Sequence, residues 1–378
     1  MVWVHAVSVG ESMAAVPLIV AMLERDSAIR IVVTTTTSTG ADNVERMLGD
    51  SVEHVYFPYD LPVILRRFLA RFKPRILIIL ETELWPNTVD QCRAAGVPVV
   101  LVNARLSEKS LSGYSRVAAF SRALIQSVNA IAAQSVADAN RFLQMGASAG
   151  LVEVTGSLKF DIQVPASVRE EAEVLKRKLG VNRPVIVFGS TREGEEALLL
   201  DAVFDLKAEF ENLLFIFAPR HPERFVDVAE LFRSANLHVV TQSSGAPCSE
   251  DVSVYIADSM GELPRFYAAA DVAFVGGSLL PYGGHNVLEP AALGTPVLSG
   301  PYTQNFAETC TLLRSVGALI VVDDGDELVH VAGRWLKDSN ERDRVGQLGS
   351  DVVREHGGAT RRTLELVDNH ILSNAAEI

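Results

Sequence analysis

The sequence predicts an α/β protein of two doubly wound domains, and three observations lead to this prediction. Short apolar runs of strand length alternate with helical patterns along the whole chain, as in parallel sheets that helices cover on both faces. The alternation starts afresh at Pro184, where the run PVIVFGS begins. The chain of 378 residues is also too long for one ordinary core. We therefore expect one domain at 1–157 and a second at 158–378, whose closing helices are candidates to pack back on the first.

A series of strand-like runs makes up the first domain. The runs are VWVHAV, IRIVVTTT, VEHVYFP, RILIILE, VPVVLVNA, NAIAAQS and LVEVTG. The helices expected among them are one after Ser8 that ends near Glu24, one after Ser38, Leu61–Phe72, one after Trp85, Tyr114–Ser127 and Val136–Met145. Residues 156–165 are expected to link the two domains.

The second domain repeats the pattern. Its expected strands are PVIVFGS, LLFIFAP, LHVVTQ, VSVYIAD, DVAFVGG, TPVLSG and ALIVVDD. Its expected helices begin at Glu193, Pro222, Gly261, near Asn286 and near Asn305, and three closing helices end at about Leu372. Open parallel sheets bind ligands beyond the carboxyl ends of their strands, so two such domains in tandem predict a ligand cleft there.

Composition excludes several classes of protein. Hydrophobic residues make up 48% and charged residues 21% of the chain, and no apolar run has the length of a membrane span. Cys92, Cys248 and Cys310 are far apart, which argues against a disulfide framework and a thiolate metal site. The net charge of −13 lies after residue 157, because the part before it holds as many basic as acidic side chains. Nucleic acid is therefore not an expected partner.

A basic cluster occurs within the balanced first domain. It consists of Arg66, Arg67, Arg71, Lys73 and Arg75. Two interpretations are open: the cluster faces an anionic surface, such as phospholipid headgroups or a phosphorylated acceptor, or it is an ordinary solvated helix face.

A glycine-rich loop, GGSLLPYGGHN, follows a strand of the second domain. Its glycines allow the backbone to approach a ligand closely, and the helix expected near Asn286 presents unpaired N–H groups and a positive dipole end to a phosphate. Glu289, one turn later, is placed to accept hydrogen bonds from a ribose diol. Together they predict a nucleotide site, and the alternative is a strand-to-helix turn whose glycines serve packing alone. The glycines concerned are Gly276, Gly277, Gly283 and Gly284.

Two carboxylates follow strands of the first domain. Glu11 lies at a glycine-flanked helix start, where the dipole is expected to depress its pKa and keep it ionised as a proton acceptor. The alternative for Glu11 is a purely structural first-turn carboxylate. Glu81 ends an apolar strand, and either takes part in the chemistry or pairs with Arg105. Lys159, beside the linker, is a cation expected to face both domains.

Further candidates follow strands of the second domain. Arg220 is suited to bind a phosphate, and the backbone of Met260 and Gly261 to read the edge of a base. Ser190 or Thr191 is the expected N-cap of the next helix.

Several common signatures are absent. The chain has no dinucleotide G-x-G-x-x-G, no phosphate-binding G-x-x-x-x-G-K, no G-x-S-x-G and no H-E-x-x-H. The acidic run Asp324-Gly325-Asp326 is better explained as a helix cap than as a set of metal ligands.

Six motifs, in order and over nearly the whole chain, resemble those of the 3-deoxy-D-manno-octulosonic acid (Kdo) transferases of lipopolysaccharide biosynthesis. They are HAVSVGE, ETELWPN, GSLKFD, APRHPER, DSMGEL and FVGGSLLPYGGHNVLEPAALGTPV. The resemblance implies the GT-B glycosyltransferase fold, with an N-terminal acceptor domain and a C-terminal donor domain of Rossmann type. It also implies an inverting transfer of Kdo from CMP-Kdo to a lipid A precursor, lipid IVA, with release of CMP and with no metal or other cofactor.

The resemblance assigns roles by motif position. Glu11 matches the family's proton acceptor, and Glu81 and Lys159 match its transition-state stabilisers. The positions that match its CMP-binding residues are Pro219, Arg220, Met260, Gly261, Glu262, Asn286, Val287, Leu288 and Glu289.

Family members carry an apolar segment ahead of the first strand that attaches them to the inner membrane, whereas the first strand here begins at Val2. The resemblance implies a place on the cytoplasmic face of the bacterial inner membrane, while this chain by itself is expected to be soluble. Two alternatives remain: a nucleotide-sugar epimerase or other GT-B glycosyltransferase, and a catalytically silent binder. The motif ETELWPN argues against the epimerase, and the presence of Glu11 and Lys159 argues against the silent binder.

Overall fold

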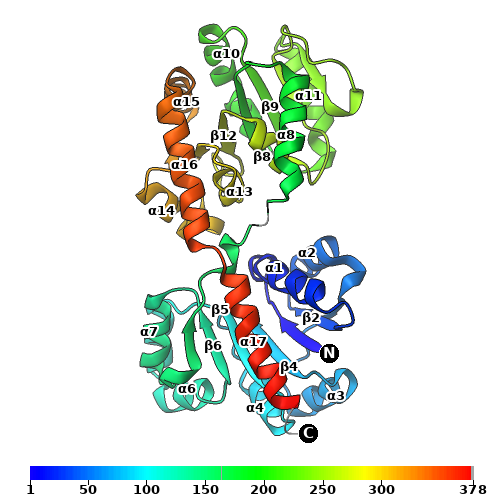
Figure 1. The fold of residues 1–378 in the computed structure, drawn as a ribbon, viewed down its shortest axis with the longest axis vertical. Coiled ribbons are helices and arrows are strands. Elements are labelled where there is room, and N and C mark those ends of the chain that lie inside the picture. Colours follow the sequence, from blue (N-terminus) through cyan, green and yellow to red (C-terminus); the bar gives the residue numbers. More distant parts are fainter. Residues whose placement is uncertain (163, 376–378) are drawn as a thin grey trace. The chain divides into compact units, whose positions relative to one another are not determined.

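The computed structural model describes residues 1–162 and 164–375, which form two compact units (Figure 1). The first unit consists of Met1–Asp161 and the chain from His356 onward, and the second of Ile162–Glu355. The closing helix therefore belongs to the first unit. Each unit has its own sheet and its own core, and they are described in turn.

Within the described residues, the sheet of the first unit has seven parallel strands in the order β3-β2-β1-β4-β5-β6-β7. The strands are β1 (Val2–His5), β2 (Ile31–Thr35), β3 (Glu53–Tyr56), β4 (Ile76–Leu80), β5 (Val99–Ala104), β6 (Ala130–Ala133) and β7 (Val152–Val154). The helices are α1 (Val9–Arg25), α2 (Ser38–Leu48), α3 (Pro62–Phe72), α4 (Pro86–Ala94), α5 (Glu108–Ser115), α6 (Ala118–Ile125), α7 (Val136–Met145) and α17 (Ala359–Ala375).

Helices cover both faces of this sheet, because successive side chains of each apolar strand point to opposite sides. On one face, Val4 lies in a buried cluster with Leu18 of α1 and Val367 of α17. On the other, Trp3 packs in a cluster with Phe68 of α3. Helix α17 also packs against α1, so the last helix completes a core that the first strand begins.

The second unit repeats the architecture with a sheet of seven parallel strands among its described residues, in the order β10-β11-β9-β8-β12-β13-β14. The strands are β8 (Val185–Thr191), β9 (Leu214–Pro219), β10 (Val239–Thr241), β11 (Val254–Ile256), β12 (Val272–Val275), β13 (Val297–Ser299) and β14 (Leu319–Val321). The helices are α8 (Ala166–Leu179), α9 (Glu195–Leu198), α10 (Leu200–Glu209), α11 (Phe225–Ser234), α12 (Leu263–Ala269), α13 (Leu288–Ala292), α14 (Ala307–Ser315), α15 (Gly325–Lys337) and α16 (Ser339–His356).

The predicted strands all form, and the main differences lie in the helices. The single helix expected at 114–127 is wrong: α5 ends at Ser115 and α6 begins at Ala118. The break falls at Val117, whose φ of −124° and ψ of 45° are not helical, and Ser121 then donates a hydrogen bond back to the carbonyl of Tyr114. Asp324 caps α15 by accepting a hydrogen bond from the N–H of Glu327, as expected.

Helix α16 lies against the loop that follows α13, through a contact that only glycine allows. A β-carbon at Gly346 would lie 1.9 Å from the carbonyl oxygen of Gly294. We therefore expect Gly346→Ala to lower the free energy of unfolding by about 3 kcal/mol, because this backbone has no room to absorb a methyl group. Urea denaturation measures this change.

Gly113→Ala is the matched control, because a β-carbon at Gly113 in α5 would meet no atom within 4 Å. This variant should be neutral or stabilising by up to about 1 kcal/mol. Equal losses in the two variants would contradict the close approach of α16.

Candidate active site

Residues of three predicted motifs lie beyond the carboxyl ends of strands in the first unit. Glu11 follows β1 in the first turn of α1, Glu81 follows β4, and Lys159 follows β7 in a short 3-10 turn at Leu158–Phe160. Since the strands are parallel, these ends share one edge of the sheet.

Glu11 is held by a capping box at the start of α1. Its Oε2 accepts a hydrogen bond of 2.8 Å from the N–H of Val7, and its Oε1 accepts one of 2.8 Å from the hydroxyl of Ser8. The hydroxyl of Ser8 in turn accepts from the N–H of Glu11. Glu11 therefore has the structural role of a first-turn carboxylate that caps α1. The same hydrogen bonds fix its carboxylate in one orientation.

The expected depression of the Glu11 pKa is wrong, because the environment raises that pKa above its usual 4.5. Burial is the largest cause, and hydrogen bonds from Val7 and Ser8 offset only part of it. The charges of Glu81 and Glu83 raise the pKa further, so these three carboxylates share one electrostatic environment. A carboxylate with a raised pKa is a stronger proton acceptor than an ordinary one.

Glu81 and Lys159, which the motifs assigned to one role, lie together. Lys159 Nζ lies 3.8 Å from Glu81 Oε1, and both side chains are about one-quarter to one-third exposed. Glu81 has a positive φ of 56°, a conformation that costs free energy for any residue other than glycine. The extended backbone of β4 thus ends abruptly at Glu81.

Asn103 is a positioning residue that the sequence reasoning missed. It is fully buried at the end of β5 and also has a positive φ, of 50°. Its Oδ1 accepts a hydrogen bond of 3.0 Å from the N–H of Leu158, next to Lys159. A buried amide that bonds to backbone 55 residues away has no local sequence signal.

In the second unit, the glycine-rich loop after β12 is held by the carboxylate of Glu195. Oε2 accepts hydrogen bonds from the N–H groups of Gly277 (2.6 Å) and Arg192 (2.8 Å). Oε1 accepts from the N–H groups of Ser278 (2.8 Å) and Leu279 (2.9 Å). Glu195 is fully buried, so these four donors replace the water that an ionised carboxylate needs. The sequence reasoning missed this residue as well.

The glycines of this loop make room for the protein's own atoms, which corrects the expectation that they admit ligand. A β-carbon at Gly276 would lie 2.7 Å from the α-carbon of Thr191, and one at Gly277 would lie 2.8 Å from the ring of His285. The packing alternative therefore holds for these two positions. The expected N-cap is also wrong: Gly194, and neither Ser190 nor Thr191, precedes α9.

The helix expected near Asn286 is short and starts later. Helix α13 spans Leu288–Ala292, so little macrodipole is available to hold a phosphate, which corrects that part of the prediction. Val287 and Leu288 are buried at 1% exposure, and their side chains belong to the core. Asn286 donates from Nδ2 to Glu289 Oε1 at 3.2 Å, which fixes the carboxylate that was assigned to a ribose.

Four basic side chains gather at this edge of the second sheet. Arg220 follows β9 directly after Pro219, and its charge, with those of Arg192 and His221, acts on the half-buried ring of His285. Burial and these three charges lower the pKa of His285 to about 4. Burial raises the pKa of Glu289, and the charge of Arg220 counteracts that rise. The arrangement is suited to an anion.

The turn Met260–Glu262, before α12, carries one exposed apolar side chain and one fixed carboxylate. Met260 is 48% exposed, and Gly261 has a positive φ of 83°. Glu262 accepts hydrogen bonds from Gln242 and Ser259 and pairs with Arg265 at 2.9 Å. Burial opposes ionisation of Glu262, but these contacts outweigh it and lower the pKa.

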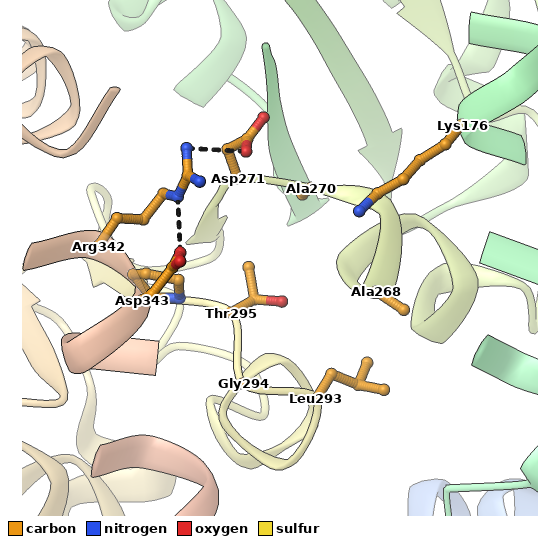
Figure 2. A pocket seen from close by; sticks show the side chains of 10 residues that line it. Lys176, Ala268, Ala270, Asp271, Leu293, Gly294, Thr295, Arg342 and Asp343 are labelled. Carbon is orange, nitrogen blue, oxygen red and sulfur yellow. Dashed lines mark hydrogen bonds and ion pairs between the residues drawn. The ribbon is translucent and has the colours of Figure 1, made fainter. Parts of the chain in front are cut away.

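A cavity of about 200 Å³ lies at the opposite edge of the second sheet (Figure 2). It is lined by Asp271, just before β12, and by Arg342 and Asp343 of α16. Arg342 bonds to Asp271 at 3.0 Å and to Asp343 at 3.2 Å, while Asp271 also accepts from the N–H of Val185. None of the predicted site residues lies here, and its polar groups tie α16 to the sheet.

Comparison with known proteins relates these loops to one family. A family model described as 3-deoxy-D-manno-octulosonic-acid transferase (kdotransferase) matches residues 1–162, and one described as glycosyl transferases group 1 matches residues 197–351. A 3-deoxy-D-manno-octulosonic acid transferase of Haemophilus influenzae is 36% identical over 374 residues, which cover 99% of this chain and 88% of that protein. The chain belongs to the Kdo transferase family. It is a glycosyltransferase, as the motifs predicted.

Other comparisons agree with this placement. The Kdo transferase of Bordetella pertussis is 38% identical over 377 residues, 97% of this chain and 87% of that protein. The solved structure of UDP-GlcNAc 2-epimerase from Neisseria meningitidis has a TM-score of 0.62, covers 98% of this chain and 99% of that chain, and is 14% identical. Identity this low shows the fold alone, so the predicted α/β GT-B fold is confirmed and no epimerase chemistry follows.

No described helix is both long enough and apolar enough to cross a bilayer. Among the same residues, no three His, Cys, Asp or Glu side chains are grouped so as to hold a metal ion.

The four hydrogen bonds to Glu195 predict that Glu195→Gln is strongly destabilising. A glutamine has one accepting oxygen, so its amide group must face two N–H donors that lose their acceptor. We expect the free energy of unfolding to fall by about 3 kcal/mol, measured by thermal or urea denaturation. Glu193→Gln, which changes an exposed carboxylate two residues away, should have almost no effect. A Glu195 variant as stable as the control would refute the anchoring role.

Proposed function

We propose that this chain transfers Kdo from CMP-Kdo to a lipid A precursor, lipid IVA, with inversion and release of CMP. The first unit binds the acceptor and supplies Glu11 as general base, and the second unit binds CMP-Kdo. Family membership supports the reaction. The observation that carries the division of roles is that the matched residues of each unit follow the carboxyl ends of its own strands. Glu11, the candidate base, lies in the first unit, and Arg220, the candidate phosphate ligand, lies in the second.

The second unit is suited to the donor and to the leaving group. Arg220 binds the phosphate and stabilises the charge that CMP carries as it departs. Glu289, fixed by Asn286, accepts hydrogen bonds from the ribose hydroxyls, and the turn Met260–Glu262 lies against the base. Because Arg220 supplies positive charge at the phosphate, we expect the transfer to need no metal or other cofactor.

Glu11 removes the proton from the acceptor hydroxyl as that oxygen attacks the anomeric carbon of Kdo. Its raised pKa and its fixed orientation both favour this role. The pair of Glu81 and Lys159 lies at the same edge of the sheet and adjusts the charge around the transition state. A single in-line displacement of CMP then inverts the anomeric centre.

The basic cluster on and after α3 is the proposed contact with the cytoplasmic face of the inner membrane. All five of its residues are exposed. Leu61 and Val63, each 55% exposed, stand at the start of the same helix, one turn from Arg66 and Arg67. Exposed apolar residues beside clustered cations are typical of a surface that meets anionic headgroups, and the acceptor is such a lipid.

The reaction is tested by measuring CMP release from CMP-Kdo with and without a tetraacyl lipid A precursor, and by weighing the lipid product in a mass spectrometer. We expect release that depends on the acceptor and a lipid product heavier by Kdo. Release of CMP with no change in lipid mass would count against transfer to this acceptor.

Glu11→Gln should lower the rate of transfer by about 100-fold to 10,000-fold while leaving the Kd of CMP unchanged, because it removes the base and keeps the shape. In the unmutated enzyme, kcat/KM should fall as the pH drops through the raised pKa of Glu11, since the protonated carboxyl cannot accept a proton. Glu24→Gln, an exposed carboxylate on the same helix, is the control. Parallel loss of CMP affinity in the Glu11 variant would contradict the assignment.

Replacing Arg66, Arg67 and Arg71 together by serine should weaken binding to phosphatidylglycerol vesicles by about 100-fold, on the basis of about 1 kcal/mol for each cation. Sedimentation with vesicles measures it. The control replaces three exposed cations of the second unit, Lys176, Arg177 and Lys178. A similar loss in both variants would show that binding reflects overall charge and not this surface.

A further inference from the structure

The guanidinium of Arg192 is held in place without a carboxylate partner. Its Cζ lies 4.6 Å from the ring centre of Tyr282, and the hydroxyl of Tyr282 donates to the carbonyl of Glu193 at 3.2 Å. In the part of the chain that the structure describes, no carboxylate lies within ion-pair distance of Arg192. The guanidinium of Arg192 is thus partly buried and stacked on Tyr282, in an arrangement that can bind an anionic ligand.

His285 supplies an unsatisfied polar atom beside it. The Nε2 of His285 is buried and has no hydrogen-bond partner among the described residues. Arg192 and His285 both lie against Gly277, where a β-carbon would come 2.9 Å from that Nε2 and 3.4 Å from Cγ of Arg192. A buried polar atom without a partner costs free energy, so a ligand that bonds to it gains affinity.

The donor of the proposed reaction has two anionic groups on one carbon. The anomeric carbon of CMP-Kdo bears both the phosphate oxygen and the carboxylate of the sugar acid. A site that binds the phosphate must therefore provide for a second anion only a few bonds away. Arg192 lies beside Arg220 in the fold, since the N–H of Arg220 donates to the carbonyl of Thr191 at 3.0 Å.

We propose that Arg192 and His285 form the subsite for the carboxylate of the donor sugar, next to the phosphate site at Arg220. Arg192 supplies the charge, and His285 donates a hydrogen bond from Nε2 in the tautomer that carries its proton there. This inference rests on the proposed function. It explains how the enzyme distinguishes a sugar acid from the neutral sugars that other nucleotide donors carry, because a neutral sugar would leave Arg192 and His285 without a partner.

The test compares three ligands by calorimetry on the full chain: CMP, CMP-Kdo, and a CMP-Kdo analogue whose carboxylate is a carboxamide. The unmutated chain should bind the analogue about 10-fold to 100-fold more weakly than CMP-Kdo. Arg192→Met should weaken CMP-Kdo by the same factor, change CMP by less than about threefold, and bind CMP-Kdo and the analogue alike. His285→Gln should show a smaller effect in the same direction.

Arg233→Met, which changes an exposed cation on α11, is the matched control and should alter none of these affinities. Equal losses for CMP and CMP-Kdo in the Arg192 variant would assign Arg192 to the phosphate and overturn the proposal. Equal affinity of the unmutated chain for CMP-Kdo and its carboxamide would also overturn the proposal. This comparison does not depend on whether a variant folds. If the unmutated chain neither releases CMP from CMP-Kdo nor binds CMP-Kdo, the proposed function fails and the subsite with it.

Discussion

The carboxylate of Glu195 is the contact on which the ligand-binding loops of the second unit depend. It gathers four N–H groups from two loops that are more than eighty residues apart in sequence, and so fixes the loop after β8 to the loop after β12. Beside it, Glu196 forms a two-pronged ion pair with Arg224, which ties the loop after β9 to the same point. Loops at the end of a parallel sheet have no sheet hydrogen bonds to hold them, so buried charges do that work here.

Several basic groups lie around this anchor, at the same edge of the second sheet. The second unit holds most of the acidic residues of the chain, yet the edge that carries Arg192, Arg220 and His285 is locally basic. A small positive region in an acidic protein attracts an anionic donor while the rest of the surface repels bulk polyanions. Because His285 has a pKa of about 4, it is uncharged near neutral pH. It therefore contributes a directed hydrogen bond to a ligand rather than a positive charge.

The sequence was sufficient for the fold because apolar runs at strand length and the restart at Pro184 are local signals. The sequence was also sufficient to select candidate site residues, because each of them lies in a motif that follows a strand. These candidates are Glu11, Glu81, Lys159 and Arg220. The sequence failed where the answer depends on distant residues. The pKa of Glu11 is set by burial and by Glu81 and Glu83, which outweigh the helix dipole on which the prediction relied.

Glu195 and Asn103 were missed for a related reason. Each resembles an ordinary polar residue at the end of a strand or the start of a helix. Apart from the N–H of Arg192, the backbone groups that they bind come from much later in the chain. The short length of α13 was readable in principle, since Gly294 and Pro296 follow it closely and both end helices. The end of a predicted helix should therefore be located before its dipole is used to predict an anion site.

The return of α17 to the first unit has a consequence for how the protein is made. Leu366 and Val367 of α17 belong to the core that covers α1, yet they are translated after the whole second unit. The first unit begins to emerge from the ribosome first and is finished last, so its apolar α1 face stays open throughout synthesis of the second. Fragments or chimaeras cut at the boundary near residue 161 would retain that exposed face, and exchange of a complete first unit requires the last helix to travel with it.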